Sequence, residues 1–185
     1  KNGWTTQSSQ NATFSFRNGL YYFSHNRNDK SWHTYYHVGI DQDRDFEIET
    51  SIRKIGGILN NGYGLIWGRK QGYDQFEFQI TGDGYFGVKK YVNGQPLDYI
   101  GWKTWSEIRQ GNGSTNKLRI AKSDHLLHFY INDVLVHTMN FEPFMGYNLG
   151  YLIYSRQEIA VDYIKVSQQR TDNLGSILGA ASSSP

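Results

Sequence analysis

The chain has 185 residues, of which 19 are Lys or Arg and 17 are Asp or Glu, so its formal net charge is only +2. Because these charges are scattered rather than clustered, we expect no nucleic-acid partner. The sequence has no Cys, which excludes disulfides, thiolate nucleophiles and Cys-ligated zinc. It also has no apolar run of about 18 residues, so we expect no membrane insertion.

Short segments that alternate apolar with polar or aromatic residues follow one another along the chain. This pattern is typical of antiparallel strands, and it predicts about twelve to fourteen of them. Tight turns are expected at Asn18-Gly19, Asn93-Gly94 and Asn132-Asp133, and no segment of about ten residues or more holds a helical period. Strands are expected at 12–16, 20–23, 34–40, 45–55, 61–68, 74–80, 82–92, 117–123, 125–131, 134–141, 148–155 and 159–166.

These segments predict an all-β fold in which two antiparallel sheets form a sandwich. Residues 1–167 are expected to form a single domain, because sandwiches of this length commonly fold as one unit. The sequence after Val166 is small, polar and unpatterned, so residues 168–185 are expected to be a flexible C-terminal tail or linker. The chain begins with Lys1 rather than Met, from which we expect a mature or excised part of a longer protein.

The stretch 45–92 is the most informative part of the sequence. Alternation assigns Trp67 to the core and turns a polar, aromatic-studded face outward on each strand. Such a face suits a sugar, whose C–H surface stacks on flat rings and whose hydroxyls need planar donors and acceptors, but it also suits an ordinary solvated sheet. The candidate carbohydrate-binding residues on these faces and in nearby loops are Glu47, Glu77, Gln79, Tyr85, Tyr91, Tyr130, Asn132, Trp102 and Trp105.

The chain contains, in this order, the segments DFEIE, GYGLIWG, YDQFEFQITGDGYFGVKK, KLRIAKSDHLLHFYINDVLV and YNLGYLIYSRQEIAVDYIKV. This order of strands and turns resembles the concanavalin A-like lectin/glucanase superfamily, and within it the bacterial laminin-G-like domains. The resemblance covers roughly residues 10–167 and implies a jelly roll of two stacked sheets, often with carbohydrate on one face. Its motifs are patterns of strand and turn, so they specify the fold better than the function.

Asp45, Glu47 and Glu49 are the candidate catalytic residues. Glucanases of the superfamily carry acids on alternate strand positions in the order E-x-D-x-E, and alternation places two such carboxylates about 7 Å apart on one face. That distance is near the separation that a retaining glycosidase needs. Here the order is D-x-E-x-E, which departs from the family pattern. The alternative is a solvated face whose acids pair with Lys89, Arg119 or Lys117.

Asp41, Asp43 and Asp45 alternate in the turn DQDRD and are the candidate ligands for calcium, a cation that prefers oxygen ligands. An EF-hand is excluded because Phe46 stands where that motif needs Gly. An acidic turn of this kind is also a common solvated feature, so the expected cofactor is none, with calcium as the alternative.

Taken together, the sequence predicts a non-catalytic recognition module for carbohydrate within a larger, exported bacterial protein that acts in the periplasm, at the cell surface or outside the cell. Two other classes stay open. One is a divergent glycoside hydrolase that uses the strand carboxylates, and the other is a structural or protein-interaction module whose outer sheet is only solvated.

Overall fold

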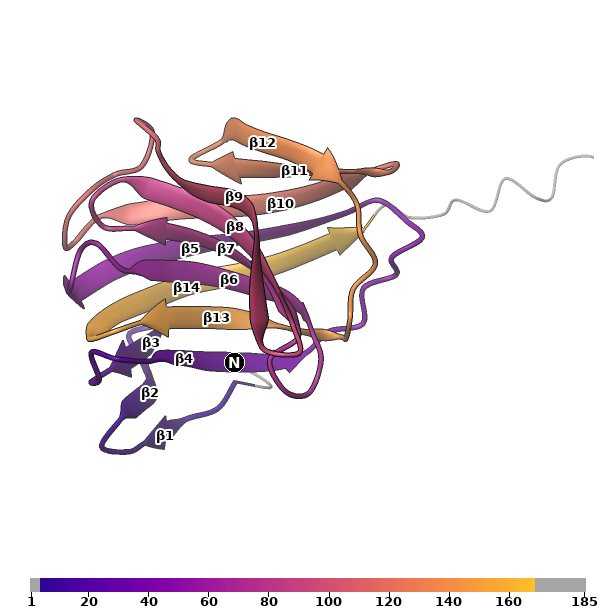
Figure 1. Cartoon of the computed structure of the whole chain (residues 1–185). Helices are drawn as coiled ribbons and strands as arrows, with labels where there is room; N and C mark the ends of the chain where they lie inside the picture. Colours follow the sequence, from indigo (N-terminus) through magenta and orange to yellow (C-terminus); the bar gives the residue numbers. More distant parts are fainter. Residues whose placement is uncertain (1–3, 169–185) are drawn as a thin grey trace, which may run out of the picture.

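The computed structural model describes residues 4–168, which form two antiparallel β-sheets without a helix (Figure 1). The expected all-β sandwich is confirmed. The larger sheet contains β1 (Gln7–Ser8), β2 (Ala12–Arg17), β3 (Leu20–His25), β5 (Phe46–Gly57), β10 (Thr115–Ser123), β11 (Leu126–Ile131), β12 (Val134–Asn140) and β14 (Gln157–Gln168). The smaller sheet contains β4 (Ser31–His37), β6 (Gly62–Arg69), β7 (Gln75–Thr81), β8 (Tyr85–Val92), β9 (Gln95–Thr104) and β13 (Asn148–Tyr154).

The chain crosses between the sheets several times, so strands that are distant in sequence become neighbours. The order is β1-β2-β3-β14-β5-β10-β11-β12 in the eight-stranded sheet and β4-β13-β6-β7-β8-β9 in the six-stranded sheet. The last strand, β14, lies between β3 and β5. Likewise β13 lies between β4 and β6. The last two strands, β13 and β14, therefore each lie between a strand from the start of the chain and a strand that follows it in sequence.

A single apolar core fills the space between the sheets, and strand alternation supplies it from both sides. Trp67, which alternation assigns to the core, is 1% exposed and stacks on Phe76 with ring centroids 5.3 Å apart. Phe78 meets Phe129 of the opposite sheet edge-to-face at 5.2 Å. The first pair lies within the smaller sheet, and the Phe78–Phe129 pair connects the two layers.

The expected tight turns at Asn18-Gly19, Asn93-Gly94 and Asn132-Asp133 are confirmed. All six residues have positive φ, as a two-residue hairpin turn of this kind requires. None of the elements between residues 4 and 168 is an apolar helix of membrane-spanning length. Residues 168–185 are the expected tail. Of these, Gln168 is the last residue of β14, and residues 169–185 lie outside the described residues.

Gly150 of β13 allows two strands of the smaller sheet to pack closely. A Cβ added there would collide with the backbone carbonyl of Thr34 on β4, which cannot move without disturbing the ladder. We expect Gly150→Ala to destabilise the protein by about 2 kcal/mol, measured by urea unfolding. Gly101→Ala on β9 is the matched control, because an added Cβ there meets no atom within 4 Å. Equal stability of the two variants would contradict the explanation.

Candidate functional site

Three polar residues, Gln75, Glu77 and Gln79, alternate on β7 and point away from the core, as predicted. The expectation that they form a solvent-exposed surface is wrong, because their exposed fractions are 1%, 1% and 0%. Side chains from the neighbouring strands and from the surrounding loops line this part of the smaller sheet. A buried carboxylate therefore lies at the centre of a face that alternation alone predicts to be solvated.

The amides on either side of Glu77 hold both of its oxygens. Gln75 Nε2 donates to Oε1 of Glu77, and Gln79 Nε2 donates to Oε2, both at 2.5 Å. Arg69, at the end of β6, donates through Nη1 to Oε1 of Gln75. Because a guanidinium only donates, this bond turns the Gln75 oxygen toward Arg69 and its amide nitrogen toward Glu77. The orientation of the carboxylate is thus determined by a chain of side chains along the strand.

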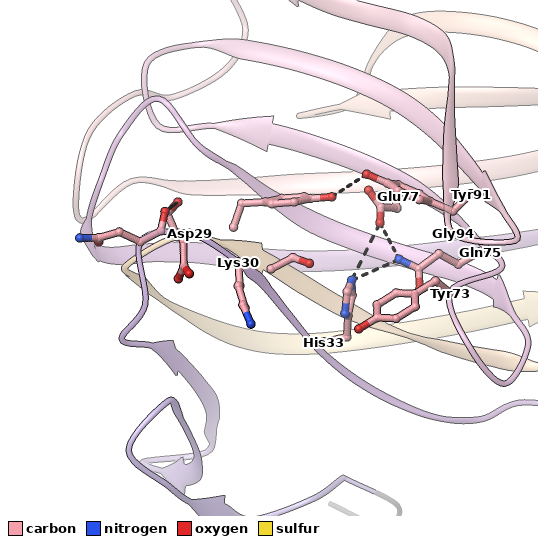
Figure 2. Close-up of a pocket in the computed structure, with 12 residues that line it drawn as sticks. Asp29, Lys30, His33, Tyr73, Gln75, Glu77, Tyr91 and Gly94 are labelled. Atoms are coloured by element: carbon pink, nitrogen blue, oxygen red, sulfur yellow. Dashed lines mark hydrogen bonds and ion pairs between the residues drawn. The ribbon is translucent and has the colours of Figure 1, made fainter.

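A pocket of about 610 Å³ opens above this carboxylate (Figure 2). Its floor comes from β4, β7, β8 and β13, and its walls come from the loops before β4, before β7 and after β8. Tyr73 stands at the edge with 61% of its surface exposed. The lining residues are Asn28, Asp29, Lys30, Ser31, His33, Tyr73, Gln75, Glu77, Tyr91, Gly94, Tyr154 and Ser155.

The loops that wall the pocket are tied to the strands by hydrogen bonds. Ser155 donates through Oγ to the carbonyl of Asn28 at 2.7 Å and through its backbone N–H to the carbonyl of Lys30 at 2.9 Å. On the other side, the N–H of Asn93 donates to Oδ1 of Asp74 at 2.6 Å, which joins the loop before β7 to the hairpin after β8. These bonds fix the position of the loops on both sides of the pocket.

Burial dominates the electrostatics of the floor. It raises the pKa of Glu77 to about 7, although hydrogen bonds from the amides and the nearby Lys89 and Arg69 act in the opposite direction. Burial and the positive charge of Arg69 lower the pKa of His33 to about 3. Nε2 of His33 lies 3.2 Å from Nε2 of Gln75 and 3.9 Å from Oε1 of Glu77. A neutral His33 that accepts from Gln75 fits both distances, so this contact is not an ion pair.

Two tyrosine hydroxyls complete the floor. Those of Tyr91 and Tyr154 lie 2.9 Å apart, and burial raises the pKa of both groups above its ordinary value. Both are therefore neutral near pH 7, and each can donate or accept a hydrogen bond. The pocket thus combines a fixed carboxylate, two hydroxyls, an imidazole and an exposed ring. This set is suited to an uncharged ligand rich in hydroxyl groups.

Comparisons with known proteins agree on the fold and leave the function open. The sequence matches no protein-family model and no curated protein. The structure is similar to the carbohydrate binding module CBM66 from Bacillus subtilis, with a TM-score of 0.67, 15% identity and coverage of 89% of this chain and 94% of that one. It is also similar to the metal-free carbohydrate recognition domain of Emp46p, with a TM-score of 0.64, 13% identity and coverage of 89% and 87%. The fold is a concanavalin A-like jelly roll.

Enzymes also have this jelly roll. The alginate lyase AlgAT5, of polysaccharide lyase family 7, is similar with a TM-score of 0.59, 10% identity and coverage of 89% of this chain and 85% of that one. Identities this low establish a shared fold alone. The function of this chain therefore depends on its own side chains.

The predicted carbohydrate-binding residues are divided between the two outer faces of the jelly roll, so the expectation of one shared surface is wrong. Glu77, Gln79, Tyr85, Tyr91 and Trp102 belong to the smaller sheet, and among them Glu77 and Tyr91 line the pocket. The strands that carry Glu47 and Tyr130, β5 and β11, belong to the larger sheet. There Arg119 bonds Glu47 at 3.0 Å and lies over the Tyr130 ring at 3.7 Å.

Trp105 and Asn132, also predicted at the binding surface, have structural contacts instead. Trp105 is packed against the core and meets Phe86 edge-to-face at 6.0 Å. Asn132 lies in the β11–β12 turn, where its side chain accepts from the N–H of Lys117 at 2.9 Å and donates to the carbonyl of Glu107 at 2.6 Å. Neither residue lines the pocket above Glu77.

The three candidate catalytic acids lie on or beside β5 of the larger sheet, away from the pocket. Glu47 pairs with Arg119 at 3.0 Å, which agrees with the solvated-face alternative. Lys117 lies 3.8 Å from Glu49, which also accepts from the Tyr163 hydroxyl at 2.8 Å. Lys122 lies 3.9 Å from Asp45. Lys89, another expected partner, is on the smaller sheet and pairs with Asp98 at 3.6 Å.

The three candidate calcium ligands do not converge. The N–H of Asp43 donates to Oδ1 of Asp41 at 3.1 Å within the turn, whereas Asp45 accepts from the N–H of Asp124 at 2.9 Å. Across residues 4–168 the structure brings no three His, Cys, Asp or Glu side chains into a group that could hold a metal ion.

Several pocket residues were not predicted from the sequence, namely His33, Tyr73, Gln75, Tyr154 and the loop 28–31. For Gln75 a local signal exists, because it alternates with Glu77 and Gln79 on one strand and shares their face. For Tyr154 and for residues 28–31 no local sequence pattern predicts a place in the pocket. Their place in the pocket depends on β4 and β13 becoming neighbours, although they are more than a hundred residues apart in sequence.

Proposed function

We propose that the protein is a non-catalytic recognition module that binds carbohydrate in the pocket above Glu77. The observation that supports this best is the oriented, buried carboxylate on the floor of a pocket whose walls are already fixed. A carboxyl group held in this way can accept from sugar hydroxyls, and above its pKa of about 7 it is charged, so that these hydrogen bonds become stronger than those between neutral groups. Preformed sites also avoid the cost of ordering loops when the ligand binds.

The remaining lining groups complement a sugar in the same way. The hydroxyls of Tyr91 and Tyr154 can donate to a sugar oxygen or accept from a sugar hydroxyl, and the exposed ring of Tyr73 offers a flat apolar surface at the edge. Two similar structures, a carbohydrate binding module and a carbohydrate recognition domain, support the same conclusion.

The wider setting is also part of the proposal. We place residues 1–167, as a laminin-G-like module followed by a tail or linker, within a larger bacterial protein exported to the periplasm, the cell surface or the medium. Carbohydrate is the proposed partner.

Binding to a glycan array, followed by isothermal titration calorimetry with the glycans found, tests the function. At pH 8, above the Glu77 pKa of about 7, we expect Glu77→Gln to weaken binding about tenfold or more, because the replacement removes the charge that strengthens the hydrogen bonds to the sugar. Tyr91→Phe, which keeps the ring and removes one hydroxyl, is expected to weaken binding severalfold. Tyr130→Ala is the control, because Tyr130 lies on the larger sheet and should leave affinity unchanged.

Circular dichroism should show that each variant is folded before its affinity is compared with that of the wild type. The proposal is wrong if the wild-type protein binds no glycan on a broad array. It is also wrong if Tyr130→Ala abolishes binding while Glu77→Gln has no effect, since the ligand would then lie on the larger sheet.

A further inference from the structure

Trp102 forms a second feature on the outer face of the smaller sheet, beside the pocket. It extends from β9, and 41% of its surface is exposed. A Cβ added at Gly87 of β8 would lie 3.5 Å from Cε3 of the indole, and one added at Gly62 of β6 would lie 3.0 Å from its Cη2. The two glycines therefore leave room for the indole to lie across the strands rather than project from them.

This indole is adjacent to the polar row of the pocket. The Cβ that would meet Trp102 above Gly62 would also meet Oε1 of Gln79, so the ring and Gln79 are neighbours there. Gln79 in turn donates to Glu77, two residues along β7. Two residues of a strand span about 7 Å, which is comparable to the length of a sugar residue.

Lys89 lies between the two features. It is the register partner of Glu77 on β8, and its Nζ is 5.5 Å from the centroid of the Trp102 ring. Asp98 of β9 pairs with it at 3.6 Å. The smaller sheet thus presents a continuous strip in the order carboxylate, paired charges and exposed indole, and each of these groups recognises a different part of a sugar.

We propose that the exposed face of Trp102 is a second sugar subsite, so that the ligand is an oligosaccharide chain rather than a single sugar. One residue of the chain enters the pocket above Glu77, and a neighbouring residue stacks its C–H face on the indole. This proposal rests on the proposed function and adds to it the chain length that the protein recognises.

The test is to titrate the protein with laminari-, cello-, xylo- and mannooligosaccharides, each from disaccharide to hexasaccharide. For a series that binds, wild-type affinity is expected to rise with length. Trp102→Ala should weaken hexasaccharide binding about tenfold, the amount expected of one good aromatic contact, and leave disaccharide binding unchanged. Trp102→Phe keeps a smaller ring and should retain part of the gain. Glu77→Gln should weaken binding at every length, and melting temperatures verify that all variants are folded.

The possible outcomes separate this proposal from the function on which it rests. If affinity does not depend on length, or if Trp102→Ala binds the hexasaccharide as well as the wild type while Glu77→Gln binds poorly, the second subsite is wrong and the pocket stands. If folded Trp102→Ala loses the disaccharide as well, the indole belongs to the first subsite and the proposal is again wrong. If no oligosaccharide and no glycan on the array binds, both proposals fail.

Discussion

Glu77→Gln is expected to gain about 3 kcal/mol of stability relative to the wild type as the pH rises from 4.5 to about 7. The pKa of Glu77 is raised from its ordinary 4.5 to about 7 because the side chain is buried. Below pH 4.5 the group is protonated in both the folded and the unfolded chain. As the pH rises toward 7 only the unfolded chain ionises, so the wild type loses stability, whereas Gln has no proton to lose.

Urea unfolding at several pH values measures this difference, and the comparison must be made between variant and wild type. His33 acts in the opposite sense in the wild-type profile, because its pKa is lowered to about 3 from 6.5. Its contribution to stability therefore increases as the pH rises toward 6.5. His33→Asn is expected to lose stability relative to the wild type over the same range. Stability profiles of Glu77→Gln and the wild type that run parallel between pH 4.5 and 8 would contradict the account.

Asn132→Ala is expected to destabilise the protein by about 3 kcal/mol without acting on the pocket. Three side-chain hydrogen bonds of Asn132 are lost, to the N–H of Lys117, the carbonyl of Glu107 and Oδ1 of Asn116. Each contributes about 1 kcal/mol. The φ of 49° adds to the loss, because Ala tolerates this region less well than Asn.

Asn132→Gly separates the two causes, since Gly accepts positive φ and lacks the amide. It should lie between the wild type and Asn132→Ala in urea unfolding. Glycan affinity of folded Asn132→Gly should equal that of the wild type. If Asn132→Gly loses glycan affinity while its stability is unchanged, Asn132 contacts the ligand, as the sequence alone predicts.

The strands and their buried faces were predictable because period-two alternation is local. Trp67 reaches the core for this reason, and the Asn-Gly and Asn-Asp turns follow from residues that accept positive φ. The sheet to which each strand belongs is not a local property. Glu47 and Glu77 have the same pattern around them, and only the crossing of the chain between layers places them on opposite faces.

The burial of the site could not be predicted from the sequence for a similar reason. Glu77 alternates with core residues like any solvated acid, and its burial comes from loops and strands that meet only in the folded chain. For Asn132 the prediction failed in a different way. Alternation with Tyr130 predicts an outward-facing side chain that is available to a ligand, but in the turn this side chain makes hydrogen bonds within the protein.

The loops around the pocket are attached by only a few hydrogen bonds, which join the loop 28–30 to Ser155 and the loop before β7 to Asn93. This arrangement determines where the sequence of the protein can vary. The floor of the pocket comes from strands, whereas both walls come from loops anchored at a few atoms. Substitutions between the anchors can alter which ligand fits while the ladder beneath stays intact. Libraries confined to Asn28, Asp29, Lys30 and Tyr73, which line the pocket from these loops, would therefore be a direct route to new ligand specificities on this scaffold.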